Sequence, residues 1–555
     1  MGRSKNKGTN FLVQGSILAF ASIISRIIGL VYRIPMTDII GDLGNSYYGS
    51  AYEVYSIMLI ISSYSLPLAV SKLVSAQVAN GNKRMAYQVF KGAMLFAVVS
   101  GTLFALLVYF GAGFFSEIYL KTPNCIFALK VLAPALLIVA VLGVLRGFFQ
   151  GLGTMMPSAI SQIVEQVINA IVSVWAAYML FGYGKRIGGV LGDPEHYAAA
   201  YGAAGGTLGT NLGAVFGLLF MIFVFCVYMT VFKRQIRREK IRAMEPFIET
   251  IRTLVITIIP VLLSSTIYNI SSFIDNGIYK HIAYAQGYIS DDIDVWWGVY
   301  TGKYKLMINV PISIASAMAA SSVPTLTASF GKGDMKAVRY EINAAMRFIM
   351  VVSFPCAVGL AVLAKPIFLL LFPSTAQTIN MAGAMMYMGS VAVILYSMST
   401  LSNGLLQGIN RLKVPVINAA IALVLHVIIL VIMMLFFHLN IYAVVLSNVL
   451  FALIMCILNA ISLTRYSGYR QEVARTFIVP AICSVVMGIA TWAVYKGLFA
   501  LCSSNTISLL LAMVVAVVVY AVMLLLLHGL TESEIRRFPK GDVIVRIAKK
   551  AHLLR

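Results

Sequence analysis

The stretch RGFFQGLGTMMP, from Arg146 to Pro157, recurs in the second half of the chain as NGLLQGINRLKVP, from Asn403 to Pro415. The two copies align at Gly147 and Gly404 and then at a Gln-Gly pair. Each copy ends on a proline, after a slip of one residue. Glycine permits a tight turn and proline is favoured at the start of a helix, so the stretch is typical of a corner between two helices. A corner that occurs twice predicts two copies of one helical unit.

The composition sets the environment of those helices. Of 555 residues, 60% are hydrophobic and only 11% are charged, whereas a soluble protein carries about 25% charged residues. Apolar runs of about 20 residues recur from end to end, and each is long enough to cross a hydrocarbon core of ~30 Å as a helix. The alternating pattern of a membrane barrel is not seen in the sequence. We therefore predict an all-α integral membrane protein.

Fourteen spans are predicted from the apolar runs. They lie at about 11–35, 50–78, 86–114, 126–150, 156–182, 198–231, 250–280, 296–324, 339–371, 379–408, 414–437, 440–464, 474–499 and 505–529.

The repeat groups these spans into lobes. GAMLFAVV at Gly92 is echoed by AAMRFIMVV at Ala344, and Pro67 matches Pro311. We therefore predict two pseudo-symmetric six-helix lobes plus two C-terminal helices. The predicted domains are an N-terminal lobe at 1–240, a C-terminal lobe at 241–470, a helix pair at 471–530 and a basic tail at 531–555. Six helices per copy make the copies parallel, and two such lobes around a central site are typical of alternating access.

Basic residues set the orientation. Most of the 42 Lys and Arg fall on the side of the N-terminal MGRSKNKG, which predicts a multi-pass membrane protein with both termini in the cytoplasm. The net charge of +22 then reflects topology. No extramembrane piece is long enough to fold around a duplex, so no nucleic-acid partner is expected. We interpret FKRQIRREKIR as an anchor at the anionic inner leaflet.

Charges inside the predicted spans point to the substrate. A charge in the membrane interior costs at least ~2.5–3.5 kcal/mol, so such a residue faces water or an opposite charge. Six basic residues remain within or at the rim of spans, namely Arg26, Arg33, Lys72, Lys130, Lys303 and Lys305, against the acids Glu53, Glu165 and Asp275. This excess predicts a cationic cavity for an anionic substrate. Arginine suits phosphate because its fork bonds two oxygens at once. The candidate substrate-binding residues are Arg26, Arg33, Lys72, Lys303, Lys305 and Glu53.

A second group is predicted to couple or gate transport. Glu165 is either the partner of a basic residue or a site for the coupling ion, and the sequence leaves both open. The same two alternatives hold for Asp275, for which Asn269 is a possible second ion ligand. Arg146 and Gln150 lie at the predicted cytoplasmic mouth. No phosphate-binding GxxxxGK[ST] motif and no catalytic motif is found, so we expect a carrier driven by an ion gradient or the membrane potential, and not an enzyme. No cofactor and no metal is expected, and the coupling ion, Na⁺ or H⁺, is unassigned.

Other titratable residues have structural interpretations. The six cysteines form no CxxC and no Cys/His cluster, which argues against a disulfide frame or a zinc site. His426, inside a span, is interpreted as bonded to a neighbouring helix in preference to a proton relay.

Four stretches carry a family resemblance. SRIIGLVYRIP, LPLAVSKLVS, VLRGFFQGLGTMMPSAISQIVEQ and KLMINVPISIASAMAASSVPTLTASF resemble the MurJ-type lipid II flippases. The resemblance is closer to their stage V sporulation protein B branch, within the multidrug/oligosaccharidyl-lipid/polysaccharide (MOP) exporter superfamily, and covers about residues 10–530. It implies two six-helix lobes around a cationic cavity, with helices thirteen and fourteen forming a groove for a lipid tail. The implied substrate is an undecaprenyl-pyrophosphate-linked saccharide, moved from the inner to the outer leaflet.

The resemblance also implies residue roles. Arg26 and Arg33 match the arginine pair of the family's first helix, with one extra residue between them. Lys72 matches the basic residue of helix two, and Glu53 is the nearest match for an acidic residue at its start. Lys305 stands where the family has arginine, and lysine cannot make the bidentate fork.

Three other functions are weighed. The sequence hardly distinguishes a lipid II flippase from an exporter of teichoic, capsular or other polysaccharide repeat units. A multidrug/cation antiporter is disfavoured by the cationic cavity. A membrane glycosyltransferase would need catalytic carboxylates outside, where the longest predicted loop offers only Asp193 and Glu195. The expected partners are the lipid-linked oligosaccharide and membrane lipids, and a monomer is expected.

Overall fold

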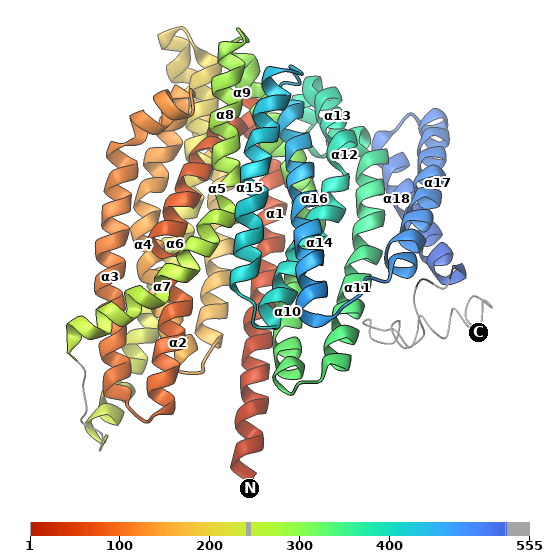
Figure 1. Cartoon of the computed structure of the whole chain (residues 1–555). Helices are drawn as coiled ribbons and strands as arrows, with labels where there is room; N and C mark the ends of the chain where they lie inside the picture. Colours follow the sequence, from red (N-terminus) through yellow and green to blue (C-terminus); the bar gives the residue numbers. More distant parts are fainter. Residues whose placement is uncertain (1, 240–245, 528, 530–555) are drawn as a thin grey trace. The chain divides into compact units, whose positions relative to one another are not determined.

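The computed structural model describes residues 2–239, 246–527 and 529, and these form helices joined by short turns (Figure 1). The predicted basic tail at 531–555 lies outside the described residues. By their contacts the residues divide into a first unit, Met1–Gly302, and a second unit, Lys303–Arg555. The boundary falls within a π-helical segment, Tyr300–Tyr304. The lobe boundaries derived from the sequence repeat stay a prediction.

The first unit contains nine α-helices among its described residues. They are α1 (Gly2–Leu59), α2 (Leu66–Ala79), α3 (Lys83–Phe110), α4 (Ile126–Gly151), α5 (Met156–Leu191), α6 (Pro194–Arg237), α7 (Phe247–Asn269), α8 (Ser271–Ala285) and α9 (Ser290–Val299). The second unit continues with α10 (Lys305–Gly331), α11 (Met335–Val362), α12 (Ala364–Leu371), α13 (Ile379–Gly389), α14 (Val391–Gly408), α15 (Lys413–Leu435), α16 (Ile441–Ser467), α17 (Val479–Cys502) and α18 (Asn505–Leu526).

The longest element, α1, is a hairpin of two helical arms. Its backbone leaves the helical region at Gly41, where φ is 69° and ψ is 179°. In a straight helix Arg33 and Tyr48 would lie about 22 Å apart along the axis. Instead the Arg33 guanidinium carbon lies 3.8 Å from the Tyr48 ring centroid, so the chain turns back at Gly41. The Asn45 amide stabilises the turn by donating to the Gly41 carbonyl oxygen at 2.7 Å.

This hairpin bears on the number of spans. Eleven helices of the described residues are long and apolar enough to cross a membrane, or twelve if the bent pair Pro373–Gly389 and Val391–Gly408 forms one span. One of the eleven, Phe20–Ala79, has 60 residues, which is about three times the length that a single crossing requires. A multi-pass helical membrane protein is confirmed, and the exact number of fourteen spans stays a prediction.

The outer connection predicted between spans five and six is mostly helical. α5 runs to Leu191 and α6 begins at Pro194, where Asp193 accepts a hydrogen bond from the His196 amide. Both helices are longer than one crossing requires. The stretch that the sequence suggested as an outer loop therefore extends α5 and α6.

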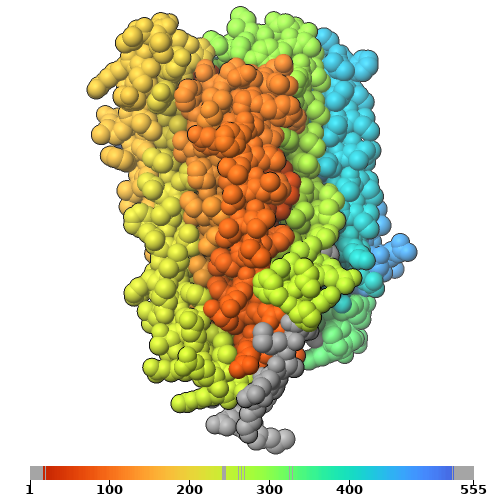
Figure 2. Space-filling view, turned by 90° about the vertical axis from the view of Figure 1, so that its left-hand side faces the viewer, coloured from red at the N-terminus to blue at the C-terminus, as the bar shows by residue number. Residues whose placement is uncertain are grey.

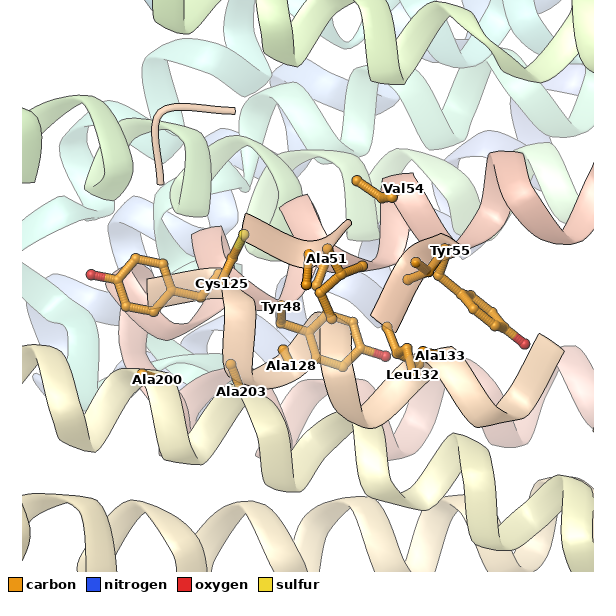
Figure 3. Close-up of a cluster of buried hydrophobic side chains, with 14 of the residues drawn as sticks. Tyr48, Ala51, Val54, Tyr55, Cys125, Ala128, Leu132, Ala133, Ala200 and Ala203 are labelled. Carbon is orange, nitrogen blue, oxygen red and sulfur yellow. The ribbon is translucent and has the colours of Figure 1, made fainter. Parts of the chain in front are cut away.

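Small residues hold α5 and α6 together. Gly205, Gly209 and Gly213 recur every four residues on α6, and a β-carbon at each would collide with the backbone or side chains of α5. This spacing of small residues permits close helix contact where the hydrophobic effect between helices is weak. A buried apolar cluster joins the second arm of α1 to α4 and α6, with Tyr48, Ala133 and Ala203 among its members (Figure 3).

The repeated corner has the same structural role in both units. A β-carbon on Gly147 would lie 2.7 Å from the Pro67 carbonyl oxygen of α2, and one on Gly404 would lie 2.8 Å from the Ala319 β-carbon of α10. The second glycine of each copy, four residues later on the same face, is equally close to the same partner helix. The repeated glycines therefore let α4 pack on α2 and α14 pack on α10.

The second unit is cored by α10, α11, α14 and α16. A polar contact joins α11 to the segment before α17, where Glu472 accepts hydrogen bonds from Asn343 and Arg347. These bonds hold the pKa of the Glu472 carboxyl below its usual range, and the bond from Asn343 contributes most to this lowering. The contact therefore attaches α17 to the remainder of the unit.

Candidate functional site

A polar face on α5 interrupts its apolar sequence. Gln162, Glu165, Gln166, Asn169 and Ser173 follow one another at spacings of three, one, three and four residues, which places them on one side of the helix. Polar groups along one face of a membrane helix are expected to meet protein or water, not lipid.

The first arm of α1 lies against this face. The Ser22 hydroxyl donates to the Gln162 side-chain oxygen at 3.2 Å, and the Asn169 amide donates to the Tyr32 hydroxyl at 3.3 Å. Residue numbers rise together on both helices, so the first arm and α5 run parallel, as two odd-numbered spans must. We call this contact the α1/α5 seam. Its members are Ser22, Arg26, Tyr32 and Arg33 of α1 and Gln162, Glu165, Gln166 and Asn169 of α5.

The two predicted arginines both belong to the seam. Arg26 and Arg33 are seven residues apart and share one side of the first arm. Arg26 is exposed and Arg33 is half-buried. The Arg33 guanidinium stacks on Tyr48, whose ring is 2% exposed. Stacking occupies the face of the guanidinium and leaves its N–H groups in the plane of the group, which fixes the orientation of the guanidinium fork.

Glu165 forms an ion pair across the repeated corner. Its carboxylate lies 2.7 Å from an Arg146 guanidinium nitrogen, and the Arg146 Nε donates to the Ser161 hydroxyl at 2.8 Å. Of the two interpretations left open by the sequence, the structure supports the partner of a basic residue. A role of Glu165 in ion coupling stays a prediction. Since Arg146 balances Glu165, the net positive charge of the seam comes from Arg26 and Arg33.

A second polar cluster attaches α8 and α9 to the second arm of α1. Asn276 donates to the Glu53 carboxylate at 2.7 Å and to the Ser50 hydroxyl at 3.1 Å. The Lys280 ammonium lies 2.7 Å from the Asp294 carboxylate, and both side chains are buried. We call this group the α8/α9 cluster: Ser46, Ser50, Glu53, Thr122, Asp275, Asn276, Lys280 and Asp294. Asp275 is itself 1% exposed.

The sequence analysis missed the central pair of this cluster. Lys280 lies at the end of the span predicted at 250–280, and the SDDID stretch at Ser290–Asp294 falls between two predicted spans, whereas Lys280 and Asp294 are 0% and 4% exposed. One signal was present, because Asn276 and Lys280 are four residues apart on one side of α8. The same analysis grouped Glu53 with the substrate ligands, and the structure places Glu53 in this cluster.

The remaining predicted site residues are dispersed. Lys72 is exposed on α2, Gln150 is half-buried at the end of α4, and Asn269, exposed at the end of α7, donates to the Ser265 carbonyl oxygen. In the second unit Lys303 is fully buried and donates to the Thr375 carbonyl oxygen at 3.2 Å and to the Thr378 hydroxyl at 2.5 Å. Lys305 is half-buried at the start of α10. The substrate roles of Lys72, Lys303 and Lys305 and the coupling or gating roles of Gln150 and Asn269 stay predictions.

Metal-binding groups are dispersed as well. Within the described residues no three His, Cys, Asp or Glu side chains are placed to hold a metal ion. All six cysteines are free thiols. His426 is buried on α15, with its Nδ1 3.0 Å from the Ser447 carbonyl oxygen of α16, which is the inter-helix contact that we expected.

Comparisons with known proteins identify the family of this chain and its fold. The family model described as polysaccharide biosynthesis protein matches residues 12–330, and the MatE family model matches 306–432. The lipid II flippase MurJ of Bacillus subtilis is 25% identical over 504 residues, which is 86% of this chain and 87% of that protein. Stage V sporulation protein B of Bacillus subtilis is 23% identical over 542 residues, 97% of this chain and 99% of that protein. A solved structure of a lipid II flippase MurJ in an inward closed conformation superposes with a TM-score of 0.65 at 14% identity, covering 91% of this chain and 97% of that one. The last comparison shows a shared fold.

Proposed function

Since the chain belongs to the polysaccharide biosynthesis protein family and has the fold of MOP-superfamily transporters, we propose that it is a lipid flippase. Its substrate is lipid II, an undecaprenyl-pyrophosphate-linked saccharide that serves as a peptidoglycan precursor. The protein moves it from the inner to the outer leaflet of the bacterial cell membrane by alternating access, with both of its own termini in the cytoplasm.

The observation that carries this proposal is the pair of arginines in the α1/α5 seam. A diphosphate cannot cross hydrocarbon unaided, and a prenyl tail cannot leave it. A site for such a molecule needs fixed positive charge within otherwise apolar helices. Arg33, oriented by Tyr48, and Arg26, exposed on the same side of the arm, provide that charge.

The same charges argue against a cation carrier. A multidrug/cation antiporter would place acidic groups at its binding site, because a cation is bound by opposite charge. In the seam the carboxylate of Glu165 is already paired with Arg146. An exporter of other lipid-linked polysaccharide units, such as teichoic or capsular precursors, shares the diphosphate and stays the second candidate.

The transport is driven by the membrane potential or an ion gradient. Each elementary charge that crosses 100 mV contributes ~2.3 kcal/mol, and loaded and empty sites differ in charge. The coupling ion is Na⁺ or H⁺, and the candidate carboxylates for sensing it are the buried Asp275 and the half-buried Glu165.

Depletion of the protein tests the function. We expect lipid II to accumulate in the inner leaflet of depleted cells, and the wild-type gene to reverse this. Accumulation of a teichoic or capsular precursor in place of lipid II would select the second candidate. Unchanged levels of all undecaprenyl-pyrophosphate lipids would contradict both candidates.

A further inference from the structure

The second arm of α1 carries a row of tyrosines beside Arg33. Tyr48 and Tyr52 stack with their ring centroids 5.7 Å apart and their planes at 8°, and Tyr52 lies 5.5 Å from Tyr55. The spacing of four and three residues places all three on one side of the arm. The guanidinium of Arg33 stacks on Tyr48 and Tyr48 stacks on Tyr52, and the Tyr55 ring, tilted by 53°, contacts Tyr52 at the end of this stack.

Of the three tyrosines, only Tyr52, in the middle of the row, has an exposed side chain. Tyr48 and Tyr55 are each 2% exposed, whereas Tyr52 is 39% exposed. Between positions 42 and 64, Tyr52 is the exposed residue of the arm and Tyr64 that of the π-helical segment Ile60–Tyr64 that follows it. If the Tyr52 ring served only to fill the core, it would be buried like Tyr48 and Tyr55.

The exposed face of Tyr52 does not have the surroundings of a lipid contact. A lipid-facing helix shows a stripe of exposed apolar side chains, as α3 does with Leu95, Val99, Leu103 and Phe110, all between 49% and 78% exposed, along the orange face in Figure 2. The second arm has no such stripe among residues 42–64. Its exposed ring instead lies next to a stacked arginine.

We propose that the Tyr52 ring is a saccharide subsite, on which the first sugar of the lipid-linked substrate stacks while Arg33 binds the diphosphate. This inference rests on the proposed function and adds the residue that recognises the sugar. A pyranose ring has a face of C–H groups, which fits the negative face of an aromatic ring, and its hydroxyls require polar neighbours.

The geometry matches the order of groups in such a lipid. The guanidinium lies 3.8 Å from the Tyr48 centroid, and that centroid lies 5.7 Å from Tyr52, so Arg33 and the Tyr52 ring are within about 10 Å of each other. Diphosphate and first sugar are covalently adjacent in the substrate. On the seam the half-buried Gln166 carries an amide for the sugar hydroxyls, whereas the Asn169 amide is buried and bonded to Tyr32 and Ser173.

The test compares two lipids on the purified full-length protein. One probe is lipid II and the other is undecaprenyl pyrophosphate, which has the tail and diphosphate without sugar. We expect the wild type to bind lipid II more tightly. Tyr52→Leu should weaken lipid II binding by about two- to tenfold, the range of an aromatic contact, and leave binding of undecaprenyl pyrophosphate unchanged. Tyr52→Phe, which keeps the ring, should behave as the wild type.

Tyr64→Leu is the matched control, because Tyr64 is a 60% exposed tyrosine on the π-helical segment Ile60–Tyr64 that follows the arm, and this change should alter neither affinity. If Tyr52→Leu weakens both lipids equally, or neither, the saccharide subsite is wrong while the flippase proposal stands. If the wild type binds neither lipid, the proposed function fails as well, and the two failures are thereby distinguished.

Discussion

Replacing Lys280 by methionine is expected to destabilise the first unit by about 3–5 kcal/mol, because removing one member of a buried ion pair leaves an uncompensated charge. The Lys280 side chain is 0% exposed and the Asp294 side chain 6% exposed, with 2.7 Å between ammonium and carboxylate. In Lys280→Met the carboxylate would keep hydrogen bonds from the Ser46 and Thr122 hydroxyls, at 3.0 and 3.1 Å. Each hydrogen bond to the charged carboxylate is worth a net ~1.5–3 kcal/mol, but both already exist in the wild type, so they do not offset the loss.

The double variant Lys280→Met/Asp294→Leu gives the sharper result. Removing both charges also removes the cost of burying them, so the double variant should be more stable than Lys280→Met alone. The energies of the two single changes should therefore fail to add, with a coupling of at least ~2 kcal/mol.

Stability is measured on the full chain in detergent micelles, by heating or by titration with a denaturing detergent. Lys72→Met is the matched control, since Lys72 is exposed on α2 and its loss should change stability by less than ~0.5 kcal/mol. The buried-pair reasoning would be refuted by a Lys280→Met protein as stable as Lys72→Met, or by single effects that simply add.

Three further outcomes are expected. Arg26→Ala should abolish transport in a folded, inserted protein and Arg26→Lys should restore part of it, since a point charge replaces only part of the fork; normal transport by Arg26→Ala in vesicles would contradict the cationic site. A cysteine at the exposed Asp292 should react with an impermeant reagent added outside intact cells and one at Arg234 should not; the reverse pattern would invert the topology. Arg146→Ala leaves the half-buried Glu165 without its partner, which should raise labelling of a cysteine at the cytoplasmic mouth, and flat labelling would assign this ion pair a purely structural role.

Much of the fold follows from local properties of the sequence. Hydropathy identifies membrane helices, because an unpaired backbone in lipid is so costly that an apolar run must be helical. The repeated corner was recognisable from its glycines alone, since only a residue without a β-carbon fits where Gly147 meets Pro67 and Gly404 meets Ala319. The position of Arg26 and Arg33 on one side of a helix also follows from their spacing.

Contacts between distant segments needed the tertiary structure. Arg146 and Glu165 are separated by a corner, so no helical period pairs them, yet they meet at 2.7 Å. Asp294 accepts a hydrogen bond from Ser46, 248 residues earlier, and its burial with Lys280 could not be read from a stretch whose charges suggest an exposed loop. Hydropathy, glycine and helical spacing are properties of one segment, and the sequence by itself therefore determined the membrane helices, the repeat and the arginine face. Whether a charge is buried, and which partner it has, depends on segments that only the folded chain brings together.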